Sequence, residues 1–300
     1  MIIGIDVGGT NFRIGALDNE FNIHNFSKIY VKDILKSDDA LFDIECAIKN
    51  YFSDIKIDAI SIGIPGTLDV ERKIIVQVPN IKGMDNLNAV EYLQSKFNVP
   101  VYLEKDVNMI INYDIYKNNI NTDGIICAVY YGTGIGNAIM IDGNILIGKN
   151  GSAGEIGHIP VDNCDEVCGC GNIGCMEAVA GGKYLKKLCD EYYRDCHISE
   201  IFIKHSNDEK IVEFVNRMSM ALATEINIIN PNKIIVGGGI INMNGFPISL
   251  FNEKLSEHVR KPYPLKDLDI IYTNDDEKAG VIGACIFALS KIQNSNIKKI

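Results

Sequence analysis

Residues 1–17 read MIIGIDVGGTNFRIGAL, and this stretch decides the fold. Two short runs typical of strands, 1–6 and 12–17, flank the glycine-rich segment VGGTN, which predicts two strands joined by a tight turn. The second half of the chain repeats the arrangement, with strand-like runs at 124–131 and 136–141 on either side of GTGIG. The repeat predicts two related domains that face each other across a cleft.

Strand-like and helix-like segments alternate along the rest of the chain, which indicates an α/β fold with crossover connections. Helices are expected at 38–53, 86–97, from Asp106 onward, and at 177–195, 208–230, 246–259 and 278–291, with further strands at 58–64, 99–103, 233–239 and 268–272. Between them, 148–176 is rich in glycine and cysteine and has little periodicity. Residues 292–300 are expected to form a polar tail.

Size and charge narrow the class of protein. A chain of 300 residues is long enough for two modest domains. The net charge of -10 argues against nucleic acid or an anionic membrane as the main partner, although a few local donors suffice to bind an anionic ligand. No apolar run approaches the roughly 18 residues that span a bilayer, and the N-terminus lacks the basic segment of a signal peptide. We therefore expect a cytoplasmic location.

Three glycine-rich segments are candidate nucleotide-binding loops. In DVGGT, at 6–10, Gly8 and Gly9 let backbone N–H groups approach a phosphate, and Thr10 adds a hydroxyl. Asp6 could bind Mg²⁺ through water. YGTGIG at 131–136 offers the same chemistry, and VGGGI at 236–240 reads as a strand-to-helix turn. None is a P-loop. A single turn of this kind is often purely structural, but three together favour a nucleotide.

A second cluster has the composition of a metal site. His158, Cys168, Cys170 and Cys175 lie within eighteen residues and form a Cys₃His set that suits tetrahedral, structural Zn²⁺. Glycines between the cysteines provide the backbone freedom to wrap an ion. Cys164 is a competing ligand that we expect to be spare. The alternative is a loop of reduced, metal-free cysteines.

The sequence EKDVN, at 104–108, follows the buried strand at 99–103 and opens a helix. Asp106 in this position could simply be a helix N-cap, which is the usual role of an aspartate before a helix.

Taken together, the motifs of this chain resemble those of the ROK family (repressors, open reading frames and kinases of sugars) in order and spacing over about residues 1–290. They are DVGGT (6–10), GIPGTLD (63–69), VPN (78–80), EKDVN (104–108), GTGIG (132–136), GEIGHIPV (154–161) and CGCGNIGCMEAVAGG (168–182). The resemblance implies an actin/hexokinase-like (ribonuclease H-like) ATPase fold with an interdomain cleft. The implied domains are 1–117, completed by the helix at 279–300, and 118–278. ATP with Mg²⁺ and a homodimer are also implied.

The resemblance also implies roles for single residues. Asp106 matches the catalytic base that takes the proton from a sugar hydroxyl, usually O6, as it attacks the γ-phosphate. His158 would present one ring nitrogen to zinc and the other to the sugar. Matched sugar contacts are Gly66, Asn80, Glu155, His158 and Glu177. Matched nucleotide contacts are Asp6, Gly8, Gly9, Thr10, Asn11, Gly132, Thr133, Gly134, Gly136, Gly237, Gly238 and Gly239.

One departure from the family bears on the substrate. Glucokinases and N-acetylmannosamine kinases of the family usually carry Asn before the catalytic Asp, whereas this chain has Lys105, which offers only donors. KDVN, the Tyr-Asp pair at 113–114, 237–247 and 260–264 resemble bacterial D-allose kinases, which favours D-allose as the hexose. The alternative is a kinase for glucose, N-acetylmannosamine or fructose in which Lys105 points to solvent. Gly181, where Ser is common, is expected to have no functional consequence.

A sugar-sensing regulator is the alternative of a different class, because many members of the family are repressors. Those place a DNA-binding helix-turn-helix before the kinase-like part, whereas DVGGT begins here at residue 6. The chain also retains Asp106 and both phosphate turns. We therefore expect an enzyme.

Overall fold

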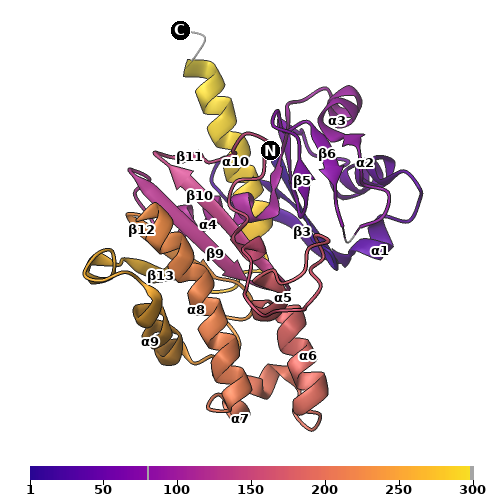
Figure 1. Ribbon diagram of the computed structural model, residues 1–300. Helices are drawn as coiled ribbons and strands as arrows, with labels where there is room; N and C mark the ends of the chain where they lie inside the picture. The colour runs from indigo at the N-terminus through magenta and orange to yellow at the C-terminus, as the bar shows by residue number, and fades with distance from the viewer. Residues whose placement is uncertain (80, 298–300) are drawn as a thin grey trace. The chain divides into compact units, whose positions relative to one another are not determined.

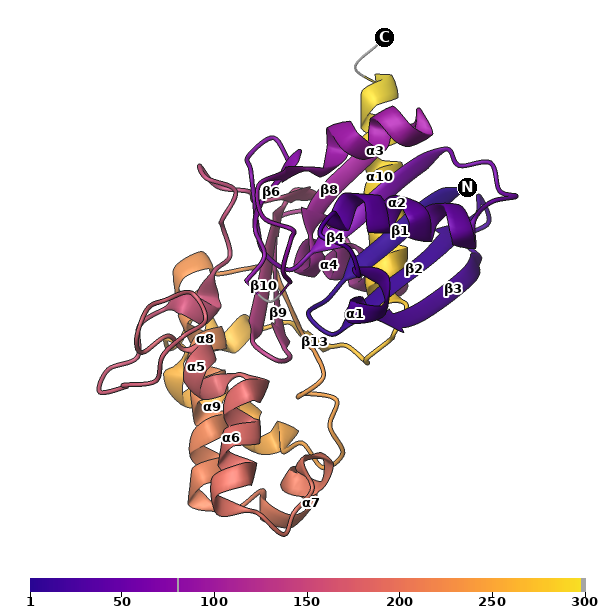
Figure 2. The same ribbon diagram turned by 90° about the vertical axis from the view of Figure 1, so that its right-hand side faces the viewer.

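The computed structural model describes residues 1–79 and 81–297. Their contacts divide the chain into two compact units (Figures 1 and 2). The first comprises Met1–Asn121, Ile147–Ala153 and the chain from Asp276 onward, and the second comprises Thr122–Leu146 and Gly154–Asp275. The expected domain of residues 118–278 differs from the second unit at both ends, where 118–121 and 276–278 belong to the first unit, and in the middle. There, residues 147–153 pack in the first unit, and the carbonyl of Gly151 accepts a hydrogen bond from Arg72.

Each unit is built on one five-stranded sheet. The first has the order β3 (Ile23–Tyr30), β2 (Asn11–Leu17), β1 (Ile2–Val7), β4 (Ala59–Ile64), β8 (Val101–Lys105), and the second has the order β11 (Asn144–Ile145), β10 (Ile135–Ile141), β9 (Ile125–Tyr131), β12 (Lys233–Gly237), β13 (Ile270–Tyr272). In each sheet, the first three strands of this order are antiparallel to their neighbours. The last two strands run parallel to the third one, which is β1 in the first sheet and β9 in the second. The same strand order in both units confirms the repeat and the α/β fold.

Helices cover both faces of the first sheet. They are α1 (Val31–Ile34), α2 (Ala40–Tyr51), α3 (Ala89–Phe97), α4 (Asp106–Lys117) and α10 (Ala279–Ile297). Side chains alternate across a strand, so Ile3 and Ile5 of β1 pack into the core shared with α2 and α3, while Ile2 contacts α10 residues. Gly4 admits α10, drawn yellow in Figure 1, because a Cβ there would lie 2.2 Å from the carbonyl oxygen of Val281.

The second unit packs its helices into one large apolar core with the sheet. They are α5 (Glu177–Ala180), α6 (Gly182–Tyr192), α7 (Ile201–His205), α8 (Glu209–Ile229) and α9 (Ile248–His258). Tyr131 at the end of β9 is fully buried, donates a hydrogen bond to the carbonyl of Met218 at 2.7 Å and stacks edge-on against Phe251. This core holds the end of β9, where the second glycine turn begins.

Three details of the expected secondary structure are wrong. The helix expected at 177–195 is two helices, because Gly181 is extended (φ -92°, ψ 169°). Helix α10 continues to Ile297, so the expected polar tail is helical as far as that residue. Strand β3 and a small sheet of β5 (Thr67–Leu68), β6 (Ile74–Gln77) and β7 (Leu87–Asn88) were not expected, because β3 is half-exposed without clear alternation and the strands of the small sheet are short, so neither leaves a periodic signal. No helix in the described part of the chain is long and apolar enough to cross a membrane.

Candidate active site and metal centre

Asp106 lies at the carboxyl end of the parallel strands of the first sheet. The register aligns Asp6 of β1 with Gly63 of β4 and Gly63 with Glu104 of β8, two residues before Asp106. A Cβ on Gly63 would lie 3.3 Å from the Cα of Asp106, so the missing side chain lets α4 begin close over β4. Ligands of α/β proteins bind at this edge of a sheet.

The carboxylate of Asp106 does not cap its helix. Lys105 occupies the N-cap position, and Asp106 is the first helical residue, where its Oδ1 accepts a hydrogen bond from the Val107 N–H at 2.8 Å. Burial, reinforced by the negative charge of Asp6, raises the pKa of Asp106 to about 6. The N-cap interpretation is therefore wrong, and a carboxylate that titrates near neutral pH suits general-base chemistry.

Asp6 is paired with Arg13, a residue that none of the sequence motifs singles out. The guanidinium Nη1 of Arg13 lies 2.8 Å from Asp6 Oδ2. Burial raises the pKa of Asp6, and Arg13 opposes that rise. A Cβ on Gly280 would lie 2.5 Å from Asp6 Cγ, so α10 also closes in on this carboxylate. The hairpin register, which pairs Asp6 with Arg13, is a signal that could have found the pair.

The two predicted phosphate turns occupy equivalent places in the two sheets, each between the first and second strands of its unit. In the first, Gly8 N–H donates to the carbonyl of Asn11 at 2.8 Å, while Gly9 and Thr10 are exposed. In the second, residues 132–136, Gly132 N–H donates to the carbonyl of Gly134 at 3.0 Å, and Thr133 is exposed. Both turns therefore offer an exposed threonine beside backbone that glycine leaves open.

Glu177 lies against the second turn. Its Oε2 accepts a hydrogen bond from the Ile135 N–H at 2.9 Å, and a Cβ on Gly134 would lie 1.9 Å from the same oxygen. The structure thus brings a candidate sugar contact and a candidate nucleotide turn together within the second unit. The sequence gives no sign of this contact, because Ile135 and Glu177 are 42 positions apart.

The segment after Glu177 also docks on this turn. Gly182 N–H donates to the carbonyl of Gly132 at 2.8 Å, and Lys183 N–H to that of Thr133 at 3.0 Å. A Cβ on Gly181 would lie 2.8 Å from the Glu177 carbonyl oxygen. The glycine at this position therefore permits a close approach of α5 to the turn, while the expectation that it has no functional consequence stays a prediction.

The third glycine loop follows β12, which pairs with β9, and so lies next to the second turn. Gly238 has φ +94°, and a Cβ there would lie 2.6 Å from the Tyr131 N and O atoms. Ile240 N–H donates to the carbonyl of Tyr131 at 2.9 Å. Gly237 is buried, whereas Gly239 is exposed with open space at its Cα. The structure therefore brings 132–136 and 237–239 together.

The four predicted metal ligands converge. Their ligand atoms all lie within 4.8 Å of one another, with Cys168 Sγ 3.6 Å from His158 Nδ1 and Cys170 Sγ 3.6 Å from Cys175 Sγ. Zn–S bonds of about 2.3 Å in a tetrahedron put ligands about 3.7 Å apart, so the set fits Zn²⁺. Cys164 is not a member of the group.

The orientation of His158 leaves one ring nitrogen directed away from the cysteines. Nδ1 faces Cys168, and Nε2 lies 3.6 Å from Oε2 of Glu155, whose side chain is 43% exposed. A metal bound at Nδ1 would fix the ring and leave Nε2 as a donor. His158 and Glu155 thus form one polar pair beside the candidate metal site.

The remaining candidates fall in the first unit. Gly66 lies against the hairpin of β5 and β6, since a Cβ there would be 2.2 Å from the carbonyl oxygen of Gln77. Lys105 is only 9% exposed, so the interpretation in which it points to solvent is wrong. Asn80 lies outside the described residues.

Comparisons with known proteins agree with this architecture. A profile of the ROK family matches residues 2–291. A glucokinase of Thermotoga maritima is 25% identical over 97% of this chain and 98% of its own length. A xylose repressor of Caldicellulosiruptor bescii is 30% identical over 87% of this chain and 70% of its own length. The structure of a ROK family glucokinase from Streptomyces griseus, in complex with glucose and AMPPNP, has a TM-score of 0.78 at 22% identity, and the match covers 96% of this chain and 99% of that one, which supports the fold.

Proposed function

We propose that this chain, which belongs to the ROK family, is an ATP-dependent hexose kinase that phosphorylates the 6-hydroxyl of D-allose. The observation that carries the proposal is Asp106, whose carboxylate lies at the carboxyl end of the parallel strands and has its pKa raised to about 6. The first phosphate turn leaves the end of β1 at the same edge of that sheet.

The proposed reaction transfers one phosphoryl group. Asp106 accepts the proton of the hexose hydroxyl while the hydroxyl oxygen forms a bond to the γ-phosphorus of ATP, and the bond from that phosphorus to the β-phosphate oxygen breaks to release ADP. The backbone of both turns, with Thr10 and Thr133, would hold the phosphates, and 237–239 the adenosine side. Mg²⁺, when bound with ATP, neutralises phosphate charge. Positioning and charge neutralisation supply most of the catalysis in reactions of this kind.

Glu155, His158 and Glu177 would bind the hexose hydroxyls. The fit of the Cys₃His set supports zinc as a structural metal that fixes the ring of His158. Because Glu177 also holds the Ile135 N–H, one carboxylate would contact the sugar and support the second turn.

The choice of D-allose depends on Lys105. Its side chain is buried beside the base, where an amine that only donates hydrogen bonds would select among C3 epimers differently from an amide. Lys105→Asn should shift the ratio of kcat/KM values from allose toward glucose by about tenfold. An unchanged ratio would show that Lys105 plays no part in the choice.

The deciding experiment is a coupled ADP-release assay with allose, glucose, mannose, N-acetylmannosamine and fructose. We expect allose to have the highest kcat/KM. If another hexose had the highest kcat/KM, the proposal of a hexose kinase would stand and the proposed substrate would change. Hexose binding without ADP release would instead support a sugar-responsive regulator, the class to which the xylose repressor belongs. We also propose that the protein is located in the cytoplasm and forms a homodimer. Sedimentation velocity would test the homodimer.

A further inference from the structure

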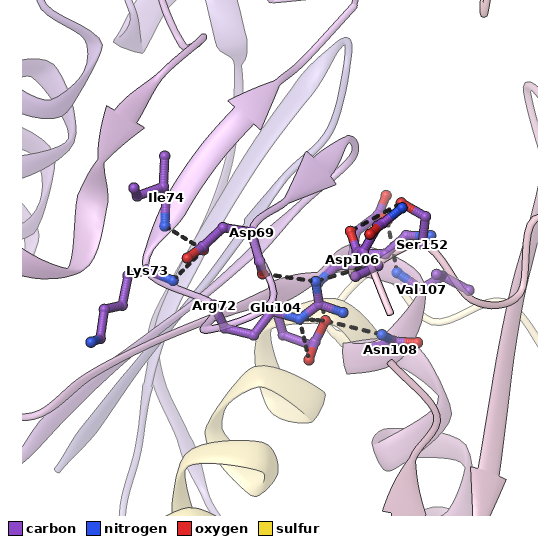
Figure 3. A network of polar contacts seen from close by, with 12 residues as sticks. Asp69, Arg72, Lys73, Ile74, Glu104, Asp106, Val107, Asn108 and Ser152 are labelled. Carbon is purple, nitrogen blue, oxygen red and sulfur yellow. Dashed lines mark hydrogen bonds and ion pairs between the residues drawn. The ribbon is translucent and has the colours of Figure 1, made fainter. Parts of the chain in front are cut away.

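The carboxylate of Glu104 organises the backbone around Asp106. Its side chain is only 2% exposed. Its Oε1 accepts hydrogen bonds from the Lys105 N–H at 2.9 Å and from Asn108 Nδ2 at 3.0 Å. Lys105 and Asn108 bracket Asp106 at the start of α4, and Figure 3 shows Glu104 beside Asn108. Glu104 therefore fixes the turn of helix that carries the proposed base.

A buried carboxylate needs a positive partner, and Arg72 provides it. Arg72 Nε lies 3.0 Å from Oε1 and 3.2 Å from Oε2 of Glu104, and the Arg72 side chain is only 9% exposed. An uncompensated charge at this depth would be strongly destabilising. The pair joins residues that lie 32 positions apart in the sequence.

The same guanidinium also holds two backbone segments. Its Nη1 donates to the carbonyl of Asp69 at 3.3 Å and to that of Gly151 at 3.2 Å. The turn at 69–74 is itself fixed, because Asp69 Oδ1 accepts hydrogen bonds from Lys73 N–H and Ile74 N–H at 2.7 Å each (Figure 3). Arg72 has φ +56°, a backbone conformation that residues other than glycine rarely adopt. The guanidinium is thus anchored on a rigid turn.

Gly151 is shaped to meet this guanidinium. It has φ +77°, and a Cβ there would lie 2.8 Å from Arg72 Nη1 and 2.7 Å from the carbonyl oxygen of Leu68. Any other residue would push segment 147–153 off the turn. Four residues later, the same chain reaches Glu155, a proposed sugar contact.

We propose that Arg72 is a positioning residue for phosphoryl transfer: it ties Glu104, and through it Asp106, to the segment that leads to Glu155. The inference rests on the proposed function, in which Asp106 is the base. A displacement of about 1 Å in a reacting group can cost about a hundredfold in rate. Loosening this anchor should therefore lower kcat more than it changes the KM for ATP.

Two variants test the role. Arg72→Lys retains the positive charge beside Glu104, but one ammonium on a flexible stem cannot reproduce the planar fork that reaches Glu104, Asp69 and Gly151 together. We expect kcat to fall about tenfold or more, with the KM for ATP within about twofold of wild type. The double variant Arg72→Met/Glu104→Gln removes both buried charges, so it should fold and show a similar loss of kcat.

Glu45→Gln is the matched control. Glu45 is another buried carboxylate of the first unit, held by Lys49 and by the hydroxyl of Tyr92. This variant should lower the melting temperature and leave kcat unchanged. If both Arg72 variants had the kcat of the wild type, the positioning role would be wrong. The proposal of a kinase would still stand in that case, provided that the wild type releases ADP.

Hydrogen–deuterium exchange gives a readout that does not depend on activity. Backbone amides of 104–108 and 147–153 should exchange about tenfold faster in Arg72→Lys than in wild type, and at wild-type rates in Glu45→Gln. Unchanged exchange in both segments would overturn the anchor even if the wild type released no ADP with any hexose. Absence of ADP release alone would overturn only the proposed function.

Discussion

At the scale of single residues, two neighbouring carboxylates of the first unit have different surroundings. Asp6 forms an ion pair with Arg13, whereas the pKa of Asp106 rises to about 6 through burial and the nearby charge of Asp6. The difference assigns the roles. Asp6 is held by the Arg13 guanidinium, which opposes the rise that burial causes in its pKa, whereas Asp106, which titrates near neutral pH, can accept a proton from a hydroxyl.

The raised pKa of Asp106 predicts how activity depends on pH. Only the ionised form can accept a proton, so kcat/KM should fall as pH drops through about 6, with the slope of a single proton. Asp106→Asn should lower kcat by about 10²- to 10⁴-fold, the usual contribution of a general base. A pH series with both proteins checks this.

The same shift has a consequence for stability. The pKa in the folded protein lies above the ordinary value of 3.8, so the contribution of Asp106 to stability is full below 3.8 and is lost as pH rises through about 6. Asp106→Asn should therefore melt at a higher temperature than wild type at pH 8. Near-normal turnover of this variant would exclude Asp106 as the base.

At the scale of elements, the loop between β11 and α5 has little regular structure. Two isolated bridges, Pro160–Cys175 and Val167–Ile173, are its only strand-like pairs among the described residues. The four ligand atoms of the Cys₃His set converge within this loop, which ends at Glu177, and Glu177 holds the second turn. A metal in this loop would therefore order both the proposed sugar contacts and that turn.

Removal of the metal should affect both substrates. The native protein should contain about one zinc per chain, measured by plasma emission spectrometry. Cys175→Ser should abolish zinc binding, lower the melting temperature and raise the KM for hexose and, through Glu177, for ATP.

Cys164→Ser is the matched control for this prediction, because Cys164 lies in the same loop outside the ligand group. It should keep the zinc, the melting temperature and both KM values. Native protein without zinc would contradict the structural role of the metal.

At the scale of the whole molecule, each unit has its own core, and a carboxylate lies inside the second one. Glu225 of α8 is only 4% exposed, and its Oε1 accepts a hydrogen bond from Asn137 at 2.7 Å. Its Oε2 is buried and has no close hydrogen-bond partner among the described residues, with the Cys127 thiol as its neighbouring weak donor. Burial raises the pKa of Glu225 to about 7. Cys127 and Tyr131 face it and stay neutral, since burial raises the pKa of both.

The raised pKa makes global stability depend on pH. It exceeds the ordinary value of 4.5, so the contribution of Glu225 is full below 4.5 and is lost as pH rises through about 7. Glu225→Gln should stabilise the protein at pH 8.5 by up to about 3 kcal/mol and have little effect at pH 5. Urea unfolding at the two pH values measures the difference.

Glu213→Gln on the same helix is the control, because Glu213 is half-exposed and paired with Arg217. It should leave the pH dependence of unfolding unchanged. Identical pH dependence in wild type and Glu225→Gln would contradict the buried-charge account.

The sequence by itself determined the local features of this protein. Strand–turn–strand at 1–17 and 124–141 is set by short runs typical of strands and glycines within a few residues of one another, and the Cys₃His set lies within eighteen residues. The position of Asp106 after a buried strand was visible as well, although only the family resemblance separated it from an ordinary helix N-cap. Short-range patterns of this kind are recorded in spacing and periodicity, and the family resemblance extended them to roles.

Only the tertiary structure decided which distant residues meet. It paired Arg72 with Glu104 and with Gly151, 79 positions away, placed Glu177 on the second turn and buried Lys105. It also moved 147–153 into the first unit. The physical reason is that these contacts arise where strands end side by side and where a buried charge must find a partner, and neither condition leaves a periodic trace along the chain.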